Sequence, residues 1–264
     1  MPEMNEYPAG TPSWVDLGSP DIEATLSFYR GLFGWDVPEA ENAEQTGGYR
    51  IAHLRGKSAA GLMPLMQEGQ PIAWTTYISV DDADATAARA KDAGGQLVAE
   101  PMDVMDLGRM ALFADPTGAA IGVWQPRSFK GAGIVNENGA ISWNELDTRD
   151  PDRAKEFYGA VFGWEFRDFG GQRNYWTLHR PGEERAVGGL MDMRGMVPDD
   201  VPPTWLVFFA ADDADATAAK ATELGGTVAN GPMDIPDVGR FAVIVDPSGA
   251  AFGIFQAPAG ATGG

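Results

Sequence analysis

Only two histidines occur in the sequence, His53 and His179, and a tyrosine stands four residues before each, Tyr49 and Tyr175. Side chains two or four positions apart on a β-strand share a face, so each tyrosine would point to the same side as its histidine. An imidazole beside a carboxylate is a common general acid–base arrangement, because the carboxylate fixes the tautomer and raises the basicity of the ring. The chemistry to look for is therefore a carboxylate that faces each histidine.

Two short motifs supply matching carboxylates. Trp14-x-Asp16 in the first half of the chain returns as Trp143-x-Glu145 in the second half. Strand alternation places the tryptophan and the acid of each motif on one face and the intervening residue on the other. A buried carboxylate is costly unless it is hydrated or hydrogen-bonded. An acid at this position in both motifs is thus a clue to function, although hydration at an open surface would also explain it.

Two interpretations of these residues stay open. In the functional one, Asp16 pairs with His53 and Glu145 with His179, and the two tyrosine hydroxyls orient them. In the other, the histidines are exposed or edge residues that have no catalytic role. This interpretation stays open because a slip of one residue in strand register would turn each histidine to the opposite face of the sheet. The residues predicted for catalysis are Asp16, His53, Glu145 and His179, and those predicted to bind a ligand are Trp14, Tyr49, Trp74, Trp124, Trp143, Tyr175 and Trp205.

The elements that position these residues are repeated along the chain. Long segments return in the same order at offsets of 126 to 131, which indicates a gene duplication. We predict a first domain at residues 11–127, a Gly- and Asn-rich linker at 128–138 and a second domain at 139–257. Examples of the repeat are Phe28-Tyr29 with Phe157-Tyr158, Phe33-Gly34-Trp35 with Phe162-Gly163-Trp164, and Asp115–Ala120 with Asp246–Ala251.

Each copy also contains two halves with the same predicted order of elements, βαβββ. In the first copy we predict strands at 14–17, 35–38, 49–55, 60–66, 74–80, 97–99, 109–114 and 120–125. Helices are expected from Pro20-Asp21 to Gly34 and from Ala83 to Ala93, where apolar residues recur at helical spacing or alanine is abundant. Helices on one face of a mostly antiparallel sheet define an α+β fold.

This pattern resembles the vicinal-oxygen-chelate superfamily, which includes glyoxalases, bleomycin-resistance proteins and dioxygenases. The resemblance rests on Asp…Phe-Tyr…Phe-Gly-Trp, then Gly-Gly, then Asp-Pro-x-Gly, and it covers nearly the whole chain. It implies four βαβββ modules whose antiparallel or mixed sheets curl into two cups with the helices outside. Metal-dependent members place His or Glu ligands at cup-facing strand positions, where the metal acts as a Lewis acid.

The resemblance also implies which positions would hold a metal here. On the first strands these are Trp14 and Trp143, and on the last strands Gly122 and Gly253. On the middle strands they are Trp74 or Thr75, and Trp205 or Leu206. Tryptophan and glycine side chains offer no donor to a cation. We therefore predict no metal and no cofactor.

Three kinds of function remain. The leading one is a metal-independent protein that binds a small organic molecule in aromatic-lined cups, since pockets are largely apolar with a few polar anchors. The second is a lyase, isomerase or hydroxylase-type enzyme that uses the Asp/Glu, His and Tyr set. The third is a non-catalytic interaction protein, in which the tryptophans fill the cups.

Composition limits the partners and the compartment. The chain has 264 residues, a formal net charge of −19 and no cysteine. An acidic protein lacks the basic footprint that phosphate binding needs, so nucleic acid and anionic membrane are excluded as partners. The absence of cysteine excludes thiol chemistry. No signal peptide or membrane span is evident, so a cytoplasmic monomer or homodimer with a small-molecule ligand is expected.

Overall fold

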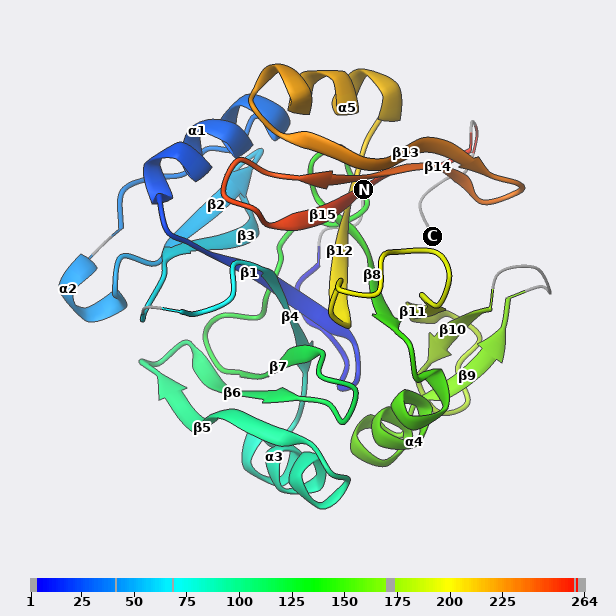
Figure 1. The fold of residues 1–264 in the computed structure, drawn as a ribbon. Coiled ribbons are helices and arrows are strands. Elements are labelled where there is room, and N and C mark those ends of the chain that lie inside the picture. Colours follow the sequence, from blue (N-terminus) through cyan, green and yellow to red (C-terminus); the bar gives the residue numbers. More distant parts are fainter. Residues whose placement is uncertain (1–3, 41, 68, 170–173, 259, 261–264) are drawn as a thin grey trace.

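The computed structural model describes residues 4–40, 42–67, 69–169, 174–258 and 260 (Figure 1). The first copy forms one mixed sheet of seven strands in the order β2-β3-β1-β4-β7-β6-β5. At its centre β1 and β4 are antiparallel, while β3 runs parallel to β1 and β7 runs parallel to β4. The strands are β1 (Pro12–Ser19), β2 (Arg50–Leu54), β3 (Lys57–Pro64), β4 (Trp74–Ser79), β5 (Gln96–Val104), β6 (Gly108–Ala114) and β7 (Ala120–Pro126).

The second copy forms an eight-stranded mixed sheet in the order β13-β14-β15-β12-β8-β11-β10-β9. Both sheets have free edge strands, so neither closes into a barrel. Each sheet is built from one copy of the repeat, and the predicted α+β class is confirmed. The strands are β8 (Ile141–Thr148), β9 (Glu165–Asp168), β10 (Tyr175–His179), β11 (Ala186–Asp192), β12 (Thr204–Ala210), β13 (Thr227–Ile235), β14 (Gly239–Val245) and β15 (Ala251–Gln256).

The longer helices begin at aspartates and lie where the two sheets meet. Asp21, Asp82, Asp150 and Asp213 each accept a hydrogen bond from the backbone N–H three residues later, which satisfies a free donor of the first turn. In Figure 1, α1 lies beside α5 and α3 lies beside α4. The helices are α1 (Ile22–Phe33), α2 (Ala43–Thr46), α3 (Ala83–Asp92), α4 (Pro151–Phe162) and α5 (Ala214–Glu223). Among the described residues, none of these helices is long and apolar enough to cross a membrane.

One predicted strand of the first copy is reduced to a single bridge. Residues 35–38 contribute only the pairing of Asp36 with His53, whereas the second copy forms the strand β9. Pro38 has no N–H to donate to a ladder. Arg167 occupies the corresponding place and pairs with Thr177. The prediction of a strand at 35–38 was wrong because it gave too little weight to this proline.

The cores join the two copies. Tyr29 on α1 packs against Phe252 with 5.6 Å between ring centroids, and Phe157 on α4 packs against Phe113 at 5.9 Å. The hydroxyl of Tyr29 donates to Asp246 Oδ2, and that of Tyr158 donates to Asp115 Oδ2, each over 2.9 Å. These aspartates also accept backbone N–H groups of their own turns. The first long helix of each copy, α1 or α4, is therefore packed against the other copy.

Candidate functional site

The two faces of each sheet have different roles. Leu17 pairs with Trp74 across β1 and β4, and Trp74 Nε1 donates to the hydroxyl of Tyr29 on α1 over 3.1 Å. These side chains therefore point to the helices. Strand alternation turns Trp14 and Asp16 to the opposite side, which we call the lateral face. The lateral face of the second sheet is defined in the same way by Trp143 and Glu145.

A chain of hydrogen bonds crosses the first lateral face. Trp14 Nε1 donates to the Tyr49 hydroxyl over 2.7 Å, and that hydroxyl donates to Asp16 Oδ2 over 3.3 Å. The tyrosine reaches the acid by passing over Gly61, which pairs with Asp16. A Cβ at Gly61 would overlap the Tyr49 hydroxyl. Glycine at this strand position is thus what permits the close approach.

Burial controls the charge of Asp16. Its side chain is 4% exposed, and its Oδ1 is buried without a hydrogen-bond partner. Loss of hydration raises the pKa of Asp16 to about 7, although hydrogen bonds from Tyr77 and Tyr49 lower it. A group with this pKa can donate or accept a proton near neutral pH.

The second lateral face repeats the frame with different chemistry. Trp143 Nε1 donates to the Tyr175 hydroxyl over 2.9 Å, and Tyr175 is hydrogen-bonded to Glu145. A Cβ at Gly189 would overlap the Tyr175 hydroxyl, as at Gly61. Phe208, paired with Trp143, replaces the tyrosine that pairs with Trp14 in the first sheet.

A second acid accompanies Glu145. Asp147 lies two residues farther along β8 and so shares its face. The two side chains are only 8% and 9% exposed, and Asp147 Oδ1 is buried without a partner. Burial raises the pKa of both carboxyls, and the charge of Glu145 raises that of Asp147 further. Gly18 occupies the corresponding place in the first copy.

The first lateral face is covered and the second is less so. Phe129, in the expected linker, packs edge-on against Trp14 with 4.9 Å between ring centroids. Its carbonyl accepts the Nε1 hydrogen of Trp124 over 2.9 Å, which anchors the segment. In the second copy, Phe255 corresponds to Trp124 and Gly260 corresponds to Phe129. Phe255 has no ring N–H to hold the segment, and Gly260 has no ring to cover Trp143. Accordingly Trp14 is 5% exposed, while Trp143 is only half-buried.

The histidines lie away from the carboxylates. His53 pairs with Ser58, three residues along β3 from Gly61, which corresponds to about 10 Å along the strand. His179 Nε2 is 2.8 Å from Thr177 Oγ1, and its Nδ1 is buried without a partner. Among the described residues, no hydrogen bond joins Asp16 to His53 or Glu145 to His179. The tyrosines, rather than the histidines, contact the acids.

The register corrects the expected metal-ligand positions. Trp14 pairs with Tyr77, and Tyr77 pairs with Gly122, so the three positions lie side by side. The middle position is therefore Tyr77 and its counterpart Phe208, instead of Trp74 or Thr75 and Trp205 or Leu206. A Cβ at Gly122 or Gly253 would overlap the Tyr77 or Phe208 ring.

These residues do not fit the family's metal. A donor side chain at either glycine has no room, and the tryptophans at the first-strand positions offer no ligand atom. Within the described part of the chain, no group of three or more His, Cys, Asp or Glu side chains could hold an ion.

The predicted aromatic residues divide between the two faces. Trp74 and Trp205 belong to the helix-side core, where they are 4% and 2% exposed and donate to Tyr29 and Tyr158. They are therefore not part of a lateral face. The others, Trp14, Tyr49, Trp124, Trp143 and Tyr175, do lie on the lateral faces.

Three further residues on the lateral faces were missed. Strand alternation could have assigned Tyr77 and Asp147 to the lateral faces, because they lie two residues after Thr75 and Glu145, which point to those faces. Phe129 carried no signal, because it lies in a segment whose composition indicates a linker.

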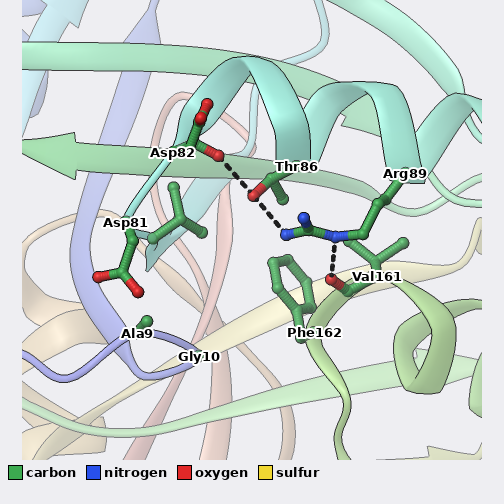
Figure 2. Close-up of a pocket in the computed structure, with 9 residues that line it drawn as sticks. Ala9, Gly10, Asp81, Asp82, Thr86, Arg89, Val161 and Phe162 are labelled. Atoms are coloured by element: carbon green, nitrogen blue, oxygen red, sulfur yellow. Dashed lines mark hydrogen bonds between the residues drawn. The ribbon is translucent and has the colours of Figure 1, made fainter.

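A separate cavity lies between α3 and the last turn of α4 (Figure 2). It has a volume of about 220 Å³, and Arg89 crosses it to donate to the Val161 carbonyl over 3.1 Å and to Thr86 Oγ1 over 2.8 Å. A cation at these carbonyls stabilises the end of a helix. Lys220 donates in the same way to Leu32 at the end of α1. Arg89 in this cavity is therefore assigned to a helix cap that both copies share.

Comparisons with known proteins agree with this fold. The Glyoxalase/Bleomycin resistance protein/Dioxygenase superfamily matches residues 11–123 and 140–254, and the chain belongs to this family. The solved structure of the Mn(II)-bound glyoxalase from Novosphingobium aromaticivorans aligns with a TM-score of 0.66 at 19% identity, covering 94% of this chain and 82% of that chain. At this identity the likeness concerns the fold alone.

Two curated relatives match over nearly their full length. "Putative glyoxylase CFP32" of Mycobacterium tuberculosis is 45% identical over 263 residues, which cover 97% of this chain and 98% of that protein. "Anthracycline biosynthesis protein DnrV" of Streptomyces peucetius is 39% identical over 267 residues, which cover 96% and 95%.

Proposed function

We propose that this protein binds a flat organic molecule on a lateral face without a metal ion. The observation that carries the proposal is the repeated constellation of an indole, a tyrosine hydroxyl and a buried carboxylate, joined over a glycine in both copies. Small-molecule sites combine apolar walls with a few fixed polar groups, and this constellation has both parts. Trp143, as the more exposed indole, is the wall of the more accessible site.

The name of one relative supports a flat ligand. The name of DnrV connects it with the biosynthesis of anthracyclines, which contain a flat polycyclic ring system. A planar ring can lie against the indole of Trp143, with Phe255 and Phe241 as neighbouring aromatic surfaces on β15 and β14. Offset or edge contacts between aromatic groups each contribute about 0.5–1.5 kcal/mol beyond area burial.

Binding of acridone, an uncharged flat tricyclic compound, tests the proposal. Its fluorescence polarisation should rise on titration with the protein, and Trp143→Ala should weaken binding about tenfold, as expected for loss of a stacking surface. Trp176→Ala is the matched control, because Trp176 lies under Lys155 on the helix side of β10. Equal weakening by both substitutions, or no binding by the wild-type protein, would contradict the proposal.

Metal independence needs its own measurement. The purified, untagged protein should contain far less than one zinc, iron, nickel or manganese ion per copy of the repeat, and a chelator should leave acridone binding unchanged. The reason is that Gly122 and Gly253 have no room for a donor side chain. If the protein contains about one ion per copy, and the chelator removes both the ion and acridone binding, the ligand site contains a metal and the proposal is wrong.

An acid–base enzyme is the second candidate, favoured by the pKa of Asp16 near 7. A general acid or base works best when its pKa is close to the operating pH. In this case Asp16→Asn would abolish turnover of a converted ligand. Unchanged product formation by this variant would exclude Asp16 from catalysis.

A further inference from the structure

The second lateral face contains a feature that a neutral flat ligand leaves unused. Glu145 and Asp147 are two acids on one strand face, each about nine-tenths buried. No salt bridge reaches either of them among the described residues. Arg149, the next residue on the same side of the chain, instead donates to the carbonyls of Val201 and Pro198. The pair is thus a buried acidic site in which the two carboxyls are hydrogen-bonded to each other and neither forms a salt bridge with a described residue.

We propose that this pair binds an organic cation, a flat ring system that carries a protonated nitrogen. The inference rests on the proposed function and narrows its ligand class. Asp147 Oδ1 is buried, lacks a hydrogen-bond partner and is the acceptor that such a ligand would meet. A protonated nitrogen has N–H donors and no acceptor, so it complements carboxylates, which have acceptors and no donor when they are ionised.

Aromatic groups favour the same ligand. Trp143 and Phe208 are adjacent in register, and Phe208 packs near Phe241 with 6.4 Å between ring centroids. A cation over such rings is attracted by their negative faces, and the attraction grows when water is excluded. The formal net charge of −19 also draws cations toward the protein at long range.

Binding of a cation should release a proton from the pair of acids. Two carboxyls in one buried site do not both ionise readily, because each charge opposes the other. Near neutral pH the empty pair therefore retains a proton. A bound cation balances the charge of the second carboxylate, so the proton that the pair retained passes to the solvent. Binding of the cation should thus strengthen as the pH rises.

The first lateral face provides an internal contrast. It has a single acid, since Gly18 occupies the place of Asp147, and two tyrosines are hydrogen-bonded to that acid. Phe129 covers its indole. Binding of the cation is accordingly assigned to the second face alone.

Two flat tricyclic probes separate the inference from the proposed function. Proflavine is cationic at neutral pH and acridone is uncharged. We expect proflavine to bind about tenfold or more tightly than acridone, and Asp147→Asn to weaken proflavine about tenfold while changing acridone less than about twofold. Asp152→Asn is the control, because it removes the same charge from the exposed surface of the same domain.

Calorimetry supplies a second readout. Proflavine titrations in two buffers of different ionisation enthalpy should show release of close to one proton per bound cation near neutral pH, and Asp147→Asn should reduce this release. Acridone binding with no preference for proflavine would overturn the inference and leave the proposed function standing. Failure of both probes would overturn both. If Asp152→Asn weakens proflavine binding as much as Asp147→Asn does, the binding is due to surface charge, and this result would also overturn the inference.

Discussion

The two lateral faces share a frame and differ in what the frame holds. In both, a tryptophan donates to a tyrosine that reaches over a glycine to a buried acid. They differ where Gly18 is replaced by Asp147, Tyr77 by Phe208 and Phe129 by Gly260. One face holds a single acid between two tyrosines under a phenyl ring, and the other holds two acids beneath a more exposed indole. A duplicated backbone register can thus be kept while the charge and access of the site change.

The largest effect should come from Asp16. Its pKa is raised from 3.8 to about 7 by burial, so the folded state binds a proton that the unfolded state releases between these values. The contribution of Asp16 to stability is present below pH 4 and is lost as the pH rises toward and past 7, amounting to about 4 kcal/mol. Asp16→Asn should therefore remove this part of the pH dependence and raise stability at pH 8 relative to the wild type.

Urea unfolding at pH 5 and pH 8 measures this difference. Asp81→Asn, at an exposed position before α3, is the control and should keep the wild-type pH dependence. If Asp16→Asn shows the same loss of stability between the two pH values as the wild type, Asp16 does not carry the raised pKa.

An intermediate effect is expected from Phe129→Ala, which would make the two faces more alike. Loss of the ring against Trp14 should cost about 1–2 kcal/mol of unfolding free energy, since the side chain is only partly buried. It should also open the first lateral face, so that the acridone stoichiometry measured by calorimetry rises from one to two per chain. Phe129→Leu, which keeps an apolar cover, should leave the stoichiometry at one. A stoichiometry of two acridone molecules per chain in the wild type would contradict the proposal that the first lateral face is less accessible than the second.

The smallest effect should distinguish the two tyrosines. Tyr49→Phe leaves Asp16 its hydrogen bond from Tyr77, whereas Tyr175→Phe leaves Glu145 without any tyrosine because Phe208 has no hydroxyl. Each substitution should lower the free energy of unfolding by about 1 kcal/mol, with the larger loss for Tyr175→Phe. Thermal unfolding of the two variants at one pH gives the comparison, and a larger loss for Tyr49→Phe would reverse our assignment of the partners.

Much of the fold followed from the sequence because repetition and alternation are local signals. The α+β class and the placement of each tryptophan with its acid came from such patterns. The histidine partners did not, because alternation fixes a face but not the position along the neighbouring strand. That position depends on the pairing of β2 with β3, which shifts between Ala52 and His53.

Two other features depend on contacts between distant parts of the chain. Trp74 starts a strand that looked able to face either side, and its partner is a tyrosine on a helix 45 residues away. Phe129 lies in a segment without strand or helix signals, yet the segment is held by backbone bonds such as Ala132 N–H to the Ser13 carbonyl. The composition of this segment, which is rich in Gly and Asn, indicates only a linker.

The hydrogen bonds of Tyr29 and Tyr158 to the opposite copy have a consequence for the history of the chain. A half-length protein would leave the helix-side rings bare, so it could be stable only as a symmetric dimer whose folding depends on its concentration. Fusion makes the encounter intramolecular and removes that dependence. It also ends the constraint that every mutation appears twice, so the two halves can differ, with aspartate at 147 in one and glycine at 18 in the other.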